Sequence, residues 1–408
     1  MNARTAAMYL AGAAAAATVV SIAAFEVLLG TAIVALLLDS KQIRLPPIML
    51  PLSLWFVGTI LSAMASGGHA GAAYPQVKKF YVYLMVIVLF SAFRTIGEVR
   101  WLVLAWTAGA ALSSLWSLVQ FARKYRAAHA AQQDFYLSYV GSRITGFMGH
   151  WMTFSGHMMI VLLMLAALIL FWRPKHKLPL ALAGLIITAG LLAAFTRSMW
   201  LGAFVGALYL VWNWQKRLVL VLPVLAGLAL AANPFSLRER ALSAFQPHAG
   251  DTDSNEHRVI TRRVGYRMIK AHPWFGVGPE EVGPQFMQYL PPDVHLPLPS
   301  GYYGHLHNIY IHYAAERGLP AAFALMWMLG QGLFDFIRAA RNAPKEAAGR
   351  WVLHGAVAAT LAVLVSGFYE LNLGDSEVLG LFLAIVACGY VAVTSLYTTS
   401  VQPQEKTS

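Results

Sequence analysis

Long apolar runs recur along almost the whole chain and are separated by short polar stretches. Each run is roughly 14 to 20 residues long, close to the ~20 helical residues that cross the hydrocarbon core of a bilayer. The weaker alternation of membrane barrel strands does not describe them. The pattern predicts an all-α polytopic membrane protein with about twelve transmembrane helices, at residues 7–21, 25–38, 47–65, 80–93, 101–121, 152–171, 178–195, 200–212, 218–232, 319–337, 351–369 and 378–396.

One long stretch, residues 233–307, breaks this pattern because it is mostly polar and rich in proline. A structureless loop of that length is uncommon, so we expect helices that lie on the outer membrane surface. Residues 259–271 lack proline and predict a helix, with irregular chain after it. Helical spacing puts Arg258 and Arg262 on one side of it, and Arg263, Arg267 and Lys270 on another.

The short basic loops predict the orientation. Lys and Arg gather at 41–44, 94–100, 173–177, 216–217 and 338–350, in every second loop. Such loops favour the cytoplasm, so both termini are expected inside and residues 233–307 outside. The predicted organisation is 1–232 with transmembrane helices 1–9 and an outer loop near 123–152, 233–318 as an outer loop with surface helices between spans 9 and 10, and 319–408 with helices 10–12 and a cytoplasmic tail.

Composition supports the membrane assignment. Hydrophobic residues make up 58% of the chain and charged residues 12%, whereas soluble domains are about a quarter charged. The net charge of +12 would suggest nucleic acid as a partner of a soluble protein, but much of it lies in short loops between spans. We therefore expect a bilayer, and no nucleic acid, as partner. The single cysteine, Cys388, excludes an intramolecular disulfide.

Clustered arginines are the first candidate chemistry. The run from Arg258 to Lys270 holds four arginines and a lysine without an acid between them. Guanidinium groups favour oriented contacts with phosphate oxygens, although a juxtamembrane basic run also binds anionic headgroups. Arg197 stands between two apolar runs, where it either snorkels to the interface or faces a diphosphate. Cations beside a membrane suggest a phosphate-bearing lipid.

Histidines close the polar stretch, at His305 and His307, with His312 nearby. A neutral imidazole is suited to accept a proton from a hydroxyl near neutral pH. The alternatives are hydrogen-bonded structural histidines and, less favoured, a metal site. The pair Asp251 and Asp253 resembles a metal-holding motif but more often caps a helix. Gly202 and Gly206 have the spacing of close helix packing. The stretch Glu316-Arg317-Gly318-Leu319-Pro320 predicts that one helix stops and another starts there.

Four separated blocks together resemble the O-antigen ligase family. They are the residues from Gly141 to Gly149, the triplet Thr196-Arg197-Ser198, the basic helix from Arg262 with its turn to Gly278, and His305-Leu306-His307-Asn308-Ile309-Tyr310 followed by Glu316-Arg317-Gly318-Leu319-Pro320. The resemblance covers roughly residues 140–375. Thr196, where serine is commoner, and His150-Trp151-Met152, in place of an asparagine and proline pattern, depart from it.

The resemblance implies a GT-C-like glycosyltransferase of the bacterial inner membrane with its active site facing the periplasm. It would ligate O-antigen glycan from undecaprenyl diphosphate to the lipid A core. We expect an inverting, metal-independent transfer without a cofactor, because the outer segments offer arginines and a histidine but no carboxylate cluster for a metal. O-antigen polymerases and protein O-oligosaccharyltransferases share much of the pattern. The candidate catalytic residues are His307, Arg197 and Arg267; the donor-binding candidates are Arg143, Arg197, Arg258, Arg262, Arg263 and Arg267; the secondary candidates are His305, Asn308 and Tyr310.

Two readings from other classes stay open. A lipid-linked glycan transporter or flippase is compatible with about twelve spans, but transporters place polar sites near the middle of the membrane. Here the basic and histidine blocks are expected at one surface. A scaffold that only binds anionic lipid would tolerate the loss of His307.

Overall fold

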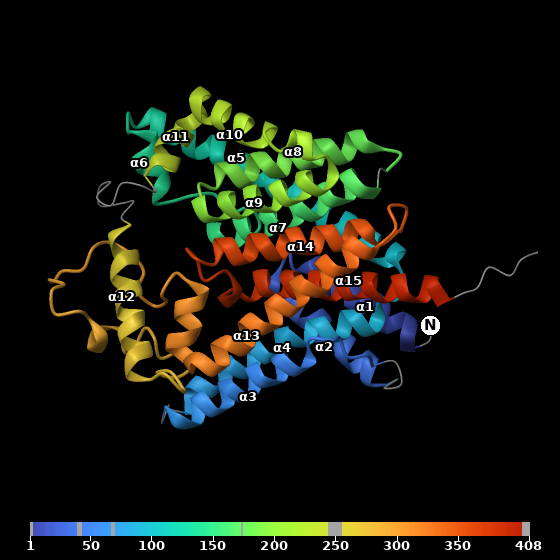
Figure 1. Cartoon of the computed structure of the whole chain (residues 1–408). Helices are drawn as coiled ribbons and strands as arrows, with labels where there is room; N and C mark the ends of the chain where they lie inside the picture. Colours follow the sequence, from blue (N-terminus) through green and yellow to red (C-terminus); the bar gives the residue numbers. More distant parts are fainter. Residues whose placement is uncertain (1–2, 39–42, 67–69, 173, 244–254, 402–408) are drawn as a thin grey trace, which may run out of the picture.

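The computed structural model describes residues 3–38, 43–66, 70–172, 174–243 and 255–401, and these residues form helices and connecting loops (Figure 1). The α-helices are α1 Ala3–Ala17, α2 Ile22–Leu37, α3 Met49–Ala65, α4 Ala70–Ala92, α5 Ile96–Ala130, α6 Phe135–Val140, α7 Trp151–Ala167, α8 Lys177–Ala193, α9 Arg197–Trp214, α10 Val221–Ala232, α11 Leu237–Leu242, α12 Glu256–Ala271, α13 Ile309–Asn342, α14 Arg350–Ser366 and α15 Ser376–Val401. Shorter helices are η2 Leu168–Trp172, η3 Lys216–Leu218, η4 Pro234–Ser236, η5 Phe286–Tyr289 and η6 Asn372–Gly374.

The all-α prediction is confirmed, and each of the twelve predicted apolar runs overlaps a helix. By length and composition, 4 helices in the described residues could cross a membrane, or up to 5 if one bent pair is a single span. The 4 are Ile96–Ala130, Trp151–Trp172, Ile309–Asn342 and Ser376–Leu396. Five shorter apolar helices accompany them: Ile22–Leu37, Met49–Ala65, Lys79–Ala92, Lys177–Ala193 and Arg350–Ser366. The count of about twelve spans stays a prediction.

Helix α14 lies inside the bundle and packs against α7, α9, α13 and α15. It packs closely against α9, where two glycines remove the side chains that would keep the backbones apart. A Cβ on Gly202 would lie 2.7 Å from the carbonyl oxygen of Ala362, and one on Gly206 would lie 2.9 Å from that of Ala358. The prediction of close packing from this glycine spacing is confirmed.

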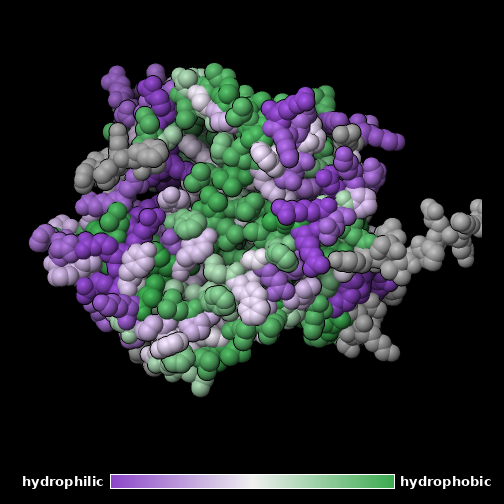
Figure 2. All heavy atoms as spheres, viewed as in Figure 1, coloured by the Kyte–Doolittle hydropathy of each residue, from purple (hydrophilic) through white to green (hydrophobic). Residues whose placement is uncertain are grey.

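The surface of the bundle carries an apolar band. Figure 2 shows hydrophobic side chains across the middle of the view and hydrophilic side chains gathered toward both ends, one of them the end where α12 lies in Figure 1. Exposed apolar side chains such as Leu112 of α5, Leu185 of α8 and Phe334 of α13 belong to helices of this bundle. Such exposure is the arrangement expected when lipid, and not water, surrounds the helices.

Helix α12 lies across one end of the bundle (Figure 1) and is held there by a second, smaller core. Ile260, Val264 and Met268, spaced four residues apart, are buried against Leu306 and Phe286. A row of apolar residues at this spacing lies on one face of a helix, which leaves the basic residues to the other faces. The predicted helix at 259–271 is confirmed, since α12 spans Glu256–Ala271.

A kink in α13 joins this end to the bundle. Gly318 has φ 83°, outside helical geometry, so the predicted stop and restart before Pro320 is confirmed. The amide of Leu319 donates to the carbonyl of Pro273 at 2.8 Å, and that of Gly278 donates to the carbonyl of Glu316 at 2.9 Å. A Cβ on Gly318 would lie 2.1 Å from the carbonyl oxygen of Trp274. Only glycine fits at position 318, where the two backbones are in contact.

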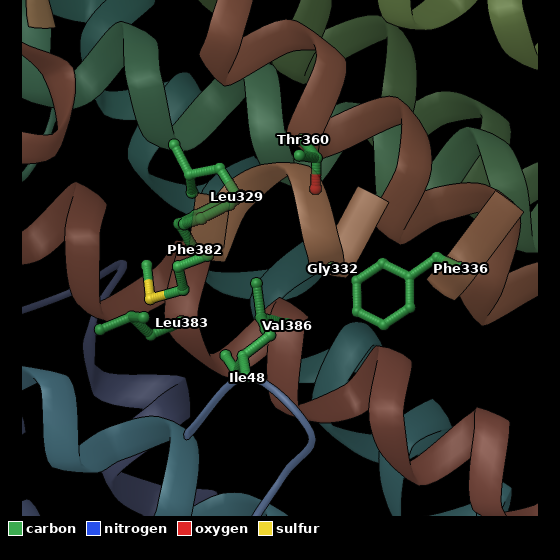
Figure 3. Close-up of a pocket in the computed structure, with 9 residues that line it drawn as sticks. Ile48, Leu329, Gly332, Phe336, Thr360, Phe382, Leu383 and Val386 are labelled. Carbon is green, nitrogen blue, oxygen red and sulfur yellow. The ribbon is translucent and has the colours of Figure 1, made fainter. Parts of the chain in front are cut away.

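A small apolar cavity of about 10 Å³ lies where α13, α14 and α15 meet (Figure 3). Gly332 and Phe336 of α13 line it together with Thr360 of α14 and Phe382 of α15. The volume is at the lower limit for a single water molecule, so this space is a packing feature and not a ligand site.

Candidate functional site

A much larger cavity of about 710 Å³ lies where the bundle meets the 300–307 loop and α12. Its lining comes from chain segments more than 200 residues apart, because Arg143 and Asp375 both reach it. The described residues that line it are Arg143, His150, Trp151, Met152, Thr153, Thr196, Arg197, Ser198, Met199, Arg240, His257, Arg258, Ser300, Gly301, Tyr302, His305, His307, Glu370, Leu371, Asn372, Gly374, Asp375 and Val378.

One wall is built around the carbonyl of Phe195. Phe195 has φ 53°, a left-handed conformation that is uncommon for a residue other than glycine. Its carbonyl oxygen accepts from Nη1 of Arg143 at 3.2 Å and from Nε of Arg240 at 2.7 Å. The guanidinium of Arg143 also lies 4.6 Å from the ring centre of Trp151. The turn between α8 and α9 thus gathers two arginines from distant segments.

Arg197 adds a third guanidinium at the first residue of α9. Its Nη1 donates to the hydroxyl of Ser243 at 2.6 Å, and its Nη2 donates to the side-chain oxygen of Asn255 at 2.8 Å. The preceding Thr196 makes no capping hydrogen bond to the helix. The first turn of α9 therefore faces the cavity with its partial positive charge uncapped by that side chain, which favours an anion there.

The opposite wall carries His307, which is buried and has φ 48°. Its Nε2 lies 3.0 Å from the carbonyl oxygen of Tyr302, and since a carbonyl only accepts, Nε2 is the donor. The other ring nitrogen, Nδ1, lies 3.6 Å from Oε2 of Glu370. The backbone amide of His307 donates to Nδ1 of His305 at 3.3 Å. Both nitrogens of the His307 ring therefore face oxygen acceptors.

Glu370 is the buried carboxylate of the site, with 3% of its surface exposed. Its Oε1 accepts from Nη2 of Arg258 at 2.6 Å. Burial alone would raise the pKa of Glu370, but the nearby Arg258 and His307 outweigh it and hold the pKa below its ordinary value. The carboxyl is thus ionised and shared between an arginine and a histidine.

Hydrogen bonds between the start of α13 and the end of α14 fix Glu370 beside His307. Asn308 caps α13 by accepting from the amide of Ile311 at 2.9 Å, and its side-chain nitrogen donates to the carbonyl of Phe368 at 2.9 Å. The amide of Ile309 donates to the carbonyl of Gly367 at 2.8 Å. Tyr310 donates to the carbonyl of Leu364 at 2.7 Å. Asn308 and Tyr310 thus hold the site together from outside the cavity lining.

His305 lines the cavity beside His307, with ring centres 4.2 Å apart. Burial, together with the neighbouring His307 and His312, lowers the pKa of His305 to about 3. His305 is therefore a neutral hydrogen-bond acceptor at ordinary pH. His312 lies nearer Glu316, with its Nε2 3.6 Å from Oε1 of that residue.

In the part of the chain that the structure describes, no group of three His, Cys, Asp or Glu side chains is placed to hold a metal ion. The pair Asp251 and Asp253 lies outside the described residues.

The predicted arginines of α12 divide into two groups. Arg258 lines the cavity, whereas Arg262, Arg263 and Arg267 do not. Arg262 donates to the carbonyl of Phe368 at 3.1 Å, so it shares a face with Arg258, as the helical spacing predicts. Arg263 forms an exposed ion pair with Asp293 at 2.5 Å. Arg267 is exposed.

Arg240 and Glu370 are among the cavity residues that were not predicted from the sequence. Arg240 is 4% exposed. It belongs to a six-residue helix, α11, whose short and charged sequence is typical of a polar loop. Glu370 directly follows an apolar run, in Phe368-Tyr369-Glu370-Leu371. A lone acid at the end of a membrane-length run is a signal that could have been used, because such residues are costly unless they are paired.

The sequence model of one family, described as O-antigen ligase, matches residues 182–326. The matched segment includes Arg197, Arg240, Arg258 and His307 of the cavity. No curated protein matches the chain. Through the segment 182–326, which contributes to both walls of the cavity, the chain is similar to the O-antigen ligase family.

Proposed function

We propose that this chain is an O-antigen ligase that transfers a glycan from undecaprenyl diphosphate to the lipid A core at the periplasmic face of the bacterial inner membrane. The cavity is the proposed site. The observation that carries the proposal is the meeting of four guanidinium groups and a buried histidine in one space, between membrane-length helices and a polar segment.

The arginines are the proposed diphosphate site. Arg143, Arg197, Arg240 and Arg258 line the cavity, against the two carboxylates Glu370 and Asp375. The excess of positive charge matches an anionic leaving group. Planar guanidinium donors contact phosphate oxygens in fixed directions. Negative charge grows on the diphosphate as the glycosidic bond breaks, and donors already in place stabilise it, typically by about 3 kcal/mol each.

His307 is the proposed general base. The acceptor sugar hydroxyl loses its proton to the imidazole while its oxygen attacks the anomeric carbon of the donor, and the diphosphate leaves with the bonding electron pair. One displacement inverts the anomeric centre. The arginines supply the charge stabilisation that a metal ion supplies in other glycosyltransferases, so the proposed reaction is metal-independent.

The test uses purified protein with an undecaprenyl-diphosphate glycan and lipid A core, in the presence of a chelator. The expected result is a joined product whose new linkage has the opposite anomeric configuration to the donor, read by NMR of the product. Retention of configuration, or activity that returns only with a divalent metal, would contradict the mechanism. His307→Ala is expected to abolish transfer while the protein remains folded and purifiable.

The same reaction mixtures separate the related activities. Glycan polymerised on the lipid carrier would identify a polymerase, and glycan on an added peptide acceptor would identify a protein O-oligosaccharyltransferase. Movement of the lipid-linked glycan across proteoliposomes without transfer would identify a flippase. A protein that only binds anionic lipid would give none of these products, and His307→Ala would not change its binding.

A further inference from the structure

We propose that Glu370 is a positioning residue for His307, which holds a hydrogen on Nδ1 and leaves Nε2 as the nitrogen that accepts the proton of the acceptor hydroxyl. In the structure the carbonyl of Tyr302 lies where that hydroxyl would bind. This inference rests on the proposed function, because it assigns the two nitrogens of the proposed base.

The ring of His307 has one acceptor on each side. Oε2 of Glu370 lies 3.6 Å from Nδ1, and the carbonyl oxygen of Tyr302 lies 3.0 Å from Nε2. An acceptor beside each nitrogen is the environment of a doubly protonated imidazolium. Such a ring accepts no proton, so one of the two acceptors has to withdraw before His307 acts as a base.

Glu370 is the acceptor that stays. It is buried, its second oxygen is held by Arg258 at 2.6 Å, and the chain just before it is bonded to the start of α13. Its Oε2 and Nδ1 of His307 are both buried and make no hydrogen bond to the described residues. A shortening of the gap to the ~2.8 Å of a charge-assisted hydrogen bond would satisfy both atoms.

Tyr302 is the acceptor that can leave. The residue is 61% exposed, and it lies between Gly301 and Gly304 in a loop outside the helices. Gly301 and Tyr302 line the cavity, so a movement of this segment opens space toward the proposed diphosphate site. The acceptor hydroxyl would then take the position of a carbonyl oxygen that already lies at hydrogen-bonding distance from Nε2.

As the Tyr302 carbonyl withdraws, Nε2 releases its proton to water and becomes a free lone pair. The acceptor O–H bond then breaks, its proton goes to Nε2, and its oxygen bonds to the anomeric carbon as the diphosphate leaves. Glu370 stays ionised throughout and stabilises the imidazolium that forms, the role that a buried carboxylate plays beside a catalytic histidine.

The other groups around the ring fit this assignment. His257 of α12 has its ring centre 5.1 Å from that of His307, and His305 lies at 4.2 Å. His305 is neutral and accepts from the backbone of His307, so it adds no positive charge. Arg258 donates to Oε1 of Glu370, and Oε2 of the same carboxylate faces His307. The carboxylate is therefore the group that favours the protonated ring.

The direct test is ¹⁵N NMR of histidine-labelled protein, with His307→Gln used to assign the signal. The expected result in the wild type is a protonated Nδ1, and in Glu370→Gln an unprotonated Nδ1 in the neutral Nε2–H form. A wild-type Nδ1 without hydrogen would overturn the proposal. This measurement needs no glycan transfer, so it gives a result even where the proposed function fails, and the wild-type spectrum decides it even where the variant does not fold.

Kinetics provide the second test. Glu370→Gln is expected to lower kcat by roughly 10²- to 10⁴-fold with little change in the KM of the donor, and to move the acid limb of the rate profile to lower pH. Glu370→Asp keeps the charge and is expected to restore part of kcat. Glu346→Gln, an exposed position between α13 and α14, is the matched control and keeps the wild-type rate. A Glu370→Gln enzyme with wild-type kcat and pH profile would overturn the proposal.

Discussion

Arg143 and Arg240 donate hydrogen bonds to the same backbone carbonyl, that of Phe195. A backbone acceptor cannot be removed by mutation, so the two arginines are tested one at a time. Arg240→Gln is expected to lower kcat/KM about 100-fold through weaker stabilisation of the leaving diphosphate, with Arg240→Lys intermediate. The measurement is the steady-state rate at varied donor concentration.

Arg238, two residues earlier in the same short helix, is the control for Arg240. Its side chain is 55% exposed and it pairs with Glu239. Arg238→Gln should therefore leave kcat/KM close to that of the wild type. Equal losses for the two variants would show that α11 acts through its fold or its total charge, and would count against a phosphate contact by Arg240.

Arg258 and Arg267 of α12 distinguish the site predicted from the sequence from the site that the geometry indicates. The sequence pattern makes Arg267 a catalytic candidate, but Arg258 lines the cavity and Arg267 is exposed outside it. If the cavity is the site, Arg258→Gln lowers kcat by at least about 100-fold and Arg267→Gln changes it less than about threefold. The reverse order would show that donor binds along the outer face of α12.

Phe336 gives a matched pair of stability tests at the small cavity in Figure 3. A Cβ on Gly332 would lie 3.7 Å from the Phe336 ring, ordinary contact, whereas one on Gly389 would lie 2.5 Å from it. Gly332→Ala is expected to raise the free energy of unfolding by about 0.5–1 kcal/mol, because alanine favours the helix. Gly389→Ala is expected to lower it by about 1–3 kcal/mol through overpacking. Thermal unfolding in one detergent compares them, and a stabilised Gly389→Ala would contradict the packing.

The folded protein is expected to lose stability in mild acid because of His305. Its folded pKa is about 3, and an unfolded histidine titrates near ~6.5. At a pH between these two values His305 is protonated in the unfolded chain and neutral in the folded chain. The stability that depends on a neutral His305 is therefore complete above about pH 6.5 and is lost as the pH falls. From pH 7.5 to 5 the wild type should lose about 2 kcal/mol more than His305→Gln. Parallel losses in Tm for both proteins would refute a buried neutral His305.

The sequence predicts the helices well because the apolar runs are local signals. It also predicts the kink before Pro320 and the close contact at Gly202 and Gly206, each of which follows from a few adjacent residues. The helix predicted at residues 259–271 is in the same class, since it follows from a local stretch without proline.

The site is harder to predict because its parts meet only through tertiary contacts. Arg258 and Glu370 are separated by 112 positions in the chain, and nothing local to either residue indicates the other. Equally, the spacing within α12 shows which arginines share a face but not which face turns toward the cavity. That choice is made by Ile260, Val264 and Met268, which pack against Leu306.

The origin of the cavity walls limits how the chain can be divided. Arg143 and Glu370 lie on either side of the matched segment 182–326, yet each contacts residues within it. Exchange of that segment between two relatives would carry Phe195 and Arg258 into a bundle whose Arg143 and Glu370 came from the other parent. The recognisable domain is therefore not an interchangeable module, and chimeras should work only when the flanking helices travel with it.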